Sequence, residues 1–146
     1  MKNKFLLTLI LCFNFFLIGF SYAKDQFSFD VTQIEILENG NKIIGSNRGE
    51  VSTSDGISIE ADNFIYRKIE NVLKANGNVI INDTINNYKI YSDSITYEKK
   101  NEKIFSKGKT KSEIKERFFI DSVDIIFFRD KKILSSDKNT SILDND

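Results

Sequence analysis

The stretch Ile57-Ser-Ile-Glu-Ala-Asp-Asn-Phe-Ile-Tyr66 contains the pattern that decides the fold. Its apolar residues first alternate with polar ones, at Ile57 and Ile59, as in a β-strand with one buried face. The alternation then changes parity, because the next apolar positions in the pattern are Phe64 and Tyr66. A two-residue period changes parity only through a bulge or a corner. The stretch therefore predicts two strands joined by a corner that keeps the same face inward.

The same pattern occurs twice more, in residues 90–97 and 118–125, and each copy follows a glycine. The change of parity falls at an aspartate that is followed by Asn or Ser, namely Asp62, Asp93 and Asp121. These aspartates are 31 and 28 residues apart, which indicates an internal repeat. A row of carboxylates at a catalytic or metal site is one interpretation. A polar cap on each corner is favoured, because it also explains the neighbouring Asn and Ser.

Turn-forming sequences separate the apolar segments, and no segment combines a helical period with capping residues. The sequence predicts an all-β, antiparallel fold in which hairpins bend at a shared corner line and stack repeat on repeat. The result is a folded sheet with two walls and an apolar lining. We expect the apolar run 123–128 to be a strand, since most of its residues are β-branched or aromatic.

The inward positions of the two walls form the candidate lining. They are Ile34, Ile36, Val51, Ile57, Ile59, Phe64, Tyr66, Leu73, Val79, Ile81, Ile90, Ile95, Tyr97, Phe118, Ile120, Val123 and Ile125. Ser58, Ile65 and Thr96 are assigned to the outer face. If the walls leave a groove, this lining would bind acyl chains by burying apolar area, at roughly 25 cal/mol per Å². The alternative is a structural or adhesive β-solenoid with a solid core and no lipid ligand.

Composition excludes several classes of function. The chain has no histidine, so imidazole catalysis and histidine metal sites are excluded, and we expect neither an enzyme nor a bound metal or cofactor. The formal net charge is zero, which gives no electrostatic basis for binding nucleic acid. The one cysteine, Cys12, lies near the N-terminus, so residues 24–146 contain no disulfide.

The N-terminal segment, residues 1–23, has the pattern of a secretory signal peptide. Lys2 and Lys4 precede an apolar run that ends at Ile18, and Ser21 and Ala23 supply small residues before a cleavage point. The run is short for a membrane-spanning helix. We therefore expect an exported protein whose mature domain comprises residues 24–146.

The repeated phrases resemble the OstA-like family, most closely at Ile59-Glu-Ala-Asp62 and Ala75-Asn-Gly-Asn-Val79. That family includes the periplasmic lipopolysaccharide-bridge protein LptA and the N-terminal periplasmic domain of the outer-membrane assembly protein LptD. The resemblance spans about residues 27–137. It implies a β-jellyroll in the periplasm, associated with outer-membrane assembly, whose apolar groove carries lipopolysaccharide acyl chains. It also implies two further kinds of partner, which are other OstA-like domains joined edge to edge and the outer-membrane assembly machinery.

Processing is directly testable. When the chain is expressed with its leader in a bacterium, the protein recovered from the periplasm should begin at Lys24, since cleavage is expected after Ala23. Intact-mass measurement gives the result. A mature protein that retains residues 1–23 would contradict the assignment.

Overall fold

The computed structural model describes residues 27–145, and the expected signal peptide, with Cys12, lies outside the described residues. Eleven strands form a single antiparallel sheet, which confirms the all-β prediction. Two 3-10 turns, η1 (Glu38–Gly40) and η2 (Lys99–Asn101), join consecutive strands. The strands are β1 (Ser28–Leu37), β2 (Lys42–Ser52), β3 (Ile57–Ala61), β4 (Asn63–Arg67), β5 (Val72–Asp83), β6 (Tyr88–Glu98), β7 (Lys103–Ile114), β8 (Phe118–Val123), β9 (Ile126–Phe128), β10 (Ile133–Ser135) and β11 (Ser141–Asp144).

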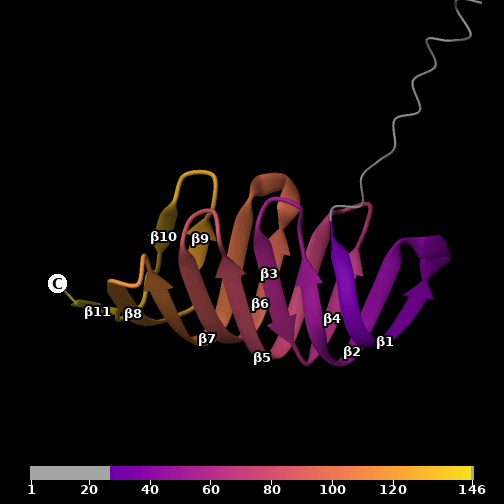
Figure 1. Cartoon of the computed structure of the whole chain (residues 1–146), viewed down its shortest axis with the longest axis horizontal. Helices are drawn as coiled ribbons and strands as arrows, with labels where there is room; N and C mark the ends of the chain where they lie inside the picture. The colour runs from indigo at the N-terminus through magenta and orange to yellow at the C-terminus, as the bar shows by residue number, and fades with distance from the viewer. Residues whose placement is uncertain (1–26, 146) are drawn as a thin grey trace, which may run out of the picture.

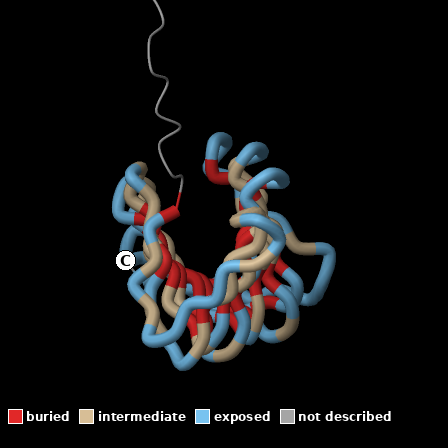
Figure 2. The backbone as a smooth tube through the Cα atoms, turned by 90° about the vertical axis from the view of Figure 1, so that its right-hand side faces the viewer, coloured by how far each residue is buried: buried red, intermediate tan, exposed pale blue. Residues whose placement is uncertain are grey.

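The sheet is folded along its length into a trough with two walls, and the strands stack along the long axis (Figure 1). In the end-on view of Figure 2 the section is U-shaped, with buried residues on the inside. We call one side wall A and the other wall B. Wall A comprises β4, β9, β10 and residues 33–37, 42–46, 72–76, 94–98 and 103–107. Wall B comprises β3, β8, β11 and residues 28–31, 49–52, 79–83, 88–92 and 109–114.

The first two corners lie at the positions that the sequence predicted. Asp62 separates β3 from β4, and the pairing of β6 with β7 shifts register between Ser92 and Ser94. The carboxylate of Asp62 accepts hydrogen bonds from the side chains of Asn78 at 2.8 Å and Arg48 at 3.2 Å. These bonds cross between strands, whereas a local backbone cap was expected. The corner aspartate therefore ties neighbouring strands to one another.

The predicted position of the third corner was wrong by three residues. It follows Val123, and the residue at the bend is Asp124, which has a φ of +54° and accepts a hydrogen bond from the Gly108 amide at 2.8 Å. The expected strand 123–128 is accordingly split between β8 and β9. With Asp124 in place of Asp121, the three corner aspartates are 31 residues apart in both intervals.

Side chains from both walls fill the space between them. Residues such as Ile59 and Ile81 of wall B and Phe64 and Leu73 of wall A are fully buried, at 0% exposure. Together with their neighbours they form one hydrophobic cluster that extends over most of the sheet. The interior of this structure is therefore a packed core.

A glycine at the β5 corner is required by close approach. Gly77 has a φ of +80°, and a Cβ atom there would lie 2.4 Å from a carboxylate oxygen of Asp62. Gly77→Ala should destabilise the fold by more than the roughly 1–2 kcal/mol of a left-handed conformation, because it adds this clash. Urea denaturation followed by circular dichroism measures the effect. Gly40→Ala is the matched control, since Gly40 has a φ of +87° and no atom near its Cβ position. Equal losses in the two variants would show that the corner contact does not matter.

Candidate functional site

The inner face of the trough carries a continuous apolar row along wall A. Its members are direct register partners on consecutive strands, namely Ile36, Ile43, Tyr66, Leu73, Tyr97, Ile104, Phe127 and Leu134. Register partners of an antiparallel sheet lie on the same face, so their side chains are neighbours. The sequence predicted three of the buried members but missed Ile104 and Phe127. The available signal for Phe127 was its position two residues after Ile125, which was assigned inward.

Most of the predicted lining lies on the inner face and is closed off from solvent. Those that are buried are Val51, Ile57, Ile59, Phe64, Tyr66, Leu73, Val79, Ile81, Ile90, Ile95, Tyr97, Ile120 and Ile125. Phe118 is half-buried and pairs with Ile114 on the same face. Ile34 and Ile36 are register partners of Gly45 and Ile43, which places them on the inner face as predicted, yet they are 51% and 62% exposed. They are exposed because β1 is the last strand of wall A at that end.

The inward assignment of Val123 was wrong. Val123 is the register partner of Lys109 and is 38% exposed on the outer face, because the corner comes after it. The position that it was expected to fill on the inner face is occupied by the buried Ser122.

Hydroxyl groups replace apolar side chains near the corner in the C-terminal part of the trough. Ser92, Thr110 and Ser122 are register partners in wall B, and Thr110 also donates to Ser106 of wall A at 2.7 Å. Ser92 and Thr110 lie within hydrogen-bond distance, at 3.2 Å. The corresponding N-terminal positions are Val31, Ala61 and Val79. The inner face is thus apolar along its N-terminal part and has a hydroxyl row deep in its C-terminal part.

Five charged residues lie at the open side of the trough, and we call them the mouth cluster. They are Asp55 and Asp83 at the open end of wall B, and Lys99, Glu102 and Arg129 in the turns at the open end of wall A. The guanidinium of Arg129 reaches across the trough to Asp83 Oδ2 and Asp55 Oδ2, both at 2.6 Å, and pairs with Glu102 of its own wall at 2.9 Å. Lys99 also donates to Asp55.

The electrostatics of the mouth cluster favour the ionised forms of its three carboxylates and of Arg129. Burial alone would raise the pKa of Asp55, but hydrogen bonds from Lys99, Thr53 and Arg129 hold it well below its usual range. The pKa of Asp83 is likewise lowered against its burial, chiefly by Arg129 and by Asn86. Burial alone would lower the pKa of Arg129, but the hydrogen bonds that it donates to Asp83, Glu102 and Asp55 raise it above its usual value. The carboxylates of the cluster and Arg129 are therefore charged at physiological pH, and they link the walls by ion pairs.

Aromatic side chains close the mouth where the charges do not. Phe27, just before β1 in wall B, packs edge-on against Tyr66 and Tyr97 of wall A, with ring centroids 4.9 and 5.8 Å apart. Tyr88 of wall B packs edge-on against Phe127 of wall A below the mouth cluster, with ring centroids 4.2 Å apart. The hydroxyl of Tyr97 donates to Glu102 at 2.9 Å, which connects the aromatic contacts to the ionic ones.

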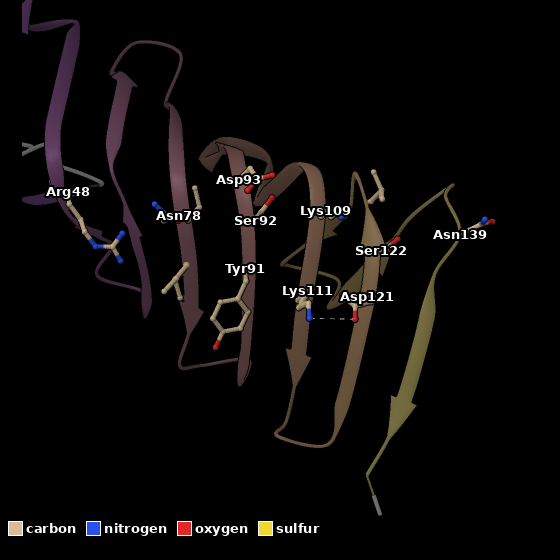
Figure 3. Close-up of a pocket in the computed structure, with 13 residues that line it drawn as sticks. Arg48, Asn78, Tyr91, Ser92, Asp93, Lys109, Lys111, Asp121, Ser122 and Asn139 are labelled. Atoms are coloured by element: carbon tan, nitrogen blue, oxygen red, sulfur yellow. Dashed lines mark ion pairs between the residues drawn. The ribbon is translucent and has the colours of Figure 1, made fainter.

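A shallow depression of about 610 Å³ runs across the strands near the corner line (Figure 3). Arg48, Lys109 and Lys111 lie around it with Asp93 and Asp121. Its basic groups are partly paired with carboxylates, since Arg48 bonds Asp62 and Lys111 lies 3.9 Å from Asp121. The depression therefore has little free charge to attract an anionic ligand, and the inner face is the better candidate site.

Within residues 27–145, no group of three or more Cys, Asp or Glu residues is arranged to hold a metal ion. No helix in that part of the chain is long and apolar enough to cross a membrane.

Substitution of Arg129 tests how much the mouth cluster contributes to the free energy of unfolding. Arg129→Met should lower the free energy of unfolding by about 3–5 kcal/mol, because it leaves the fully buried Asp83 without its cation. Adding Asp83→Asn should recover part of the loss. Arg67→Met is the control, since Arg67 pairs with Glu38 at an exposed site, and it should cost less than about 1 kcal/mol. Similar urea midpoints for the two arginine variants would contradict this account.

Comparison with known proteins supports the architecture. No protein-family model and no curated protein matches the sequence. Among solved structures, the chain is similar to LptH from Pseudomonas aeruginosa, described as the LptA homologous periplasmic component of the lipopolysaccharide transport device. The match has a TM-score of 0.73 at 10% sequence identity and covers 84% of this chain and 99% of that one. At this identity the comparison reports on the backbone, and membership of the OstA-like family stays a prediction. The chain has an LptA-like β-jellyroll fold.

Proposed function

We propose that this protein is a periplasmic lipopolysaccharide-transport module whose inner face receives the acyl chains of the lipid on their way to the outer membrane. The observation that carries the proposal is the apolar row along wall A, from Ile36 to Leu134, in a trough of LptA-like fold. An acyl chain lying along this row would bury apolar area against every strand it crosses, and the stabilisation is proportional to that area.

The exposed end of the row supports an entry point at β1. Ile34 and Ile36 face the inside yet remain open to solvent. If the two walls moved apart, the exposed apolar surface at Ile34 and Ile36 would become continuous with the apolar row that is now buried. The resemblance of the motifs to the OstA-like family and the fold of the LptH neighbour point to the same class of ligand.

The ends of the sheet support partners that join edge to edge. Along the described chain β1 pairs with β2 alone, so its other edge presents backbone donors and acceptors over ten residues. The opposite end of the sheet is formed by the short strands β10 and β11, where Ile133 and Ile142 are exposed. A further OstA-like domain, or the outer-membrane assembly machinery, would extend the trough by adding a strand to either end.

The packed interior favours the second candidate, a structural or adhesive module with a solid core. Thirteen of the predicted lining residues are buried by the protein's own side chains. The two candidates differ in one measurable property, which is whether the inner face exchanges its protein contacts for lipid.

Binding of fluorescently labelled lipopolysaccharide tests the proposal. Ile36→Glu should weaken binding by at least about tenfold, because it places an unpaired charge against the acyl chain. The variant should fold normally, since Ile36 is 62% exposed.

Gln33→Glu is the matched control. It adds the same charge to the same strand on the outer face, and its carboxylate can still accept the hydrogen bond from Asn47. It should bind lipopolysaccharide like the unmodified protein. No saturable binding by the unmodified protein would favour the solid-core candidate, and equal weakening in both variants would show that the inner face is not the site.

A further inference from the structure

The mouth cluster joins two walls that the backbone does not join at that side of the trough. Backbone hydrogen bonds run within each wall and through the corners. At the mouth the link is made by side chains, and Arg129 contacts residues 46 and 74 positions away in sequence. Opening the trough at the turn between β2 and β3 requires the contacts of Lys99 and Arg129 with Asp55 to break while the strand pairing remains.

The two carboxylates that Arg129 contacts across the mouth differ in burial and in how firmly they are held. Asp83 is fully buried, and its other oxygen accepts the amides of Ile85 and Asn86 in the β5–β6 turn, so it is fixed in wall B. Asp55 is 39% exposed and lies in the turn between β2 and β3, where it accepts from both Lys99 and Arg129. When Asp55 is removed, both cations keep Glu102 as a partner within wall A, and Arg129 also keeps Asp83 of wall B. Asp55 can therefore leave the cluster without stranding a buried charge.

The cluster also lies directly above the packed side chains that a lipid would have to displace. Tyr97, which is fully buried, bonds Glu102 of the cluster, and Tyr88 packs against Phe127 beneath it. Separating the walls at the cluster would release the aromatic contacts between them. The part of the inner face beneath the cluster is thus accessible only after the cluster has opened.

We propose that the mouth cluster is a reversible clasp, in which the turn between β2 and β3 releases Lys99 and Arg129 from the carboxylate and the carbonyl of Asp55. The walls then part at this turn and admit the acyl chains of an anionic lipid, while Arg129 keeps its ion pair with Asp83. The admission of lipid rests on the proposed transport function. The parting of the walls does not, because it is a property of the protein alone.

Spin-label distances measure the parting of the walls without any lipid. Residues 24–146 contain no cysteine, so labels can be placed at the exposed positions Ser54 of wall B and Asn101 of wall A through single cysteine substitutions. Asp55→Asn should lengthen and broaden the distance distribution between them. Glu38→Gln is the matched control, because it breaks an ion pair with Arg67 that lies within wall A. An unchanged distribution in Asp55→Asn, in a protein whose circular dichroism is intact, would overturn the clasp.

The rate of lipopolysaccharide uptake then tests the gate. Asp55→Asn should take up the labelled lipid at least about tenfold faster, because it weakens two charge-assisted hydrogen bonds, from Lys99 and from Arg129. Glu38→Gln should match the unmodified protein. Equal rates in all three proteins would overturn the gate. If the walls part in Asp55→Asn but neither it nor the unmodified protein binds lipid, the clasp stands and the transport function fails.

Discussion

The change of parity at the corner is the constraint on which the rest of the structure depends. A strand that continued straight through Asp62 would turn Phe64 and Tyr66 towards solvent. The corner instead keeps one face inward on both sides, so a single sheet supplies both walls of its own core. Left-handed residues such as Gly77, Asn78 and Asp124 supply the bend, and the close approach of Asp62 to Gly77 fixes where it occurs.

The side of the trough opposite the corners is closed by side-chain contacts and not by the backbone. The walls diverge from the corner line, and their open sides meet through aromatic rings and through the mouth cluster. An ionic link with a fully buried member is costly to assemble and costly to break singly. It is therefore better suited to fixing the spacing of the walls than to adding net stability. The link is made by side chains alone, so the strand pairing does not depend on it.

The sequence was sufficient for the repeating part of the fold. Alternation around Ile59 and Phe64 gave the inner face and the first corner correctly, because burial and strand period act over a few neighbouring residues. Val123 was misplaced because Asp121 and Asp124 are both plausible corner residues, and only the constant spacing of 31 residues distinguishes them. The mouth cluster was not predictable, since nothing in the local pattern of Asp55 or Arg129 indicates that residues 74 apart will meet.

The constant spacing of the corners has a consequence for how such a trough changes length. Each interval of 31 residues contains one passage down and one up the section, so it adds two strands, or roughly 9–10 Å, along the stack. Duplicating or deleting one interval would leave the corner line, the inward face and the pairing at both ends in phase. A one-residue insertion within a strand would instead turn the residues between it and the next corner to the opposite face. The reach of this architecture therefore changes in whole steps, and each end keeps the same edge to offer a neighbour whatever the number of steps between them.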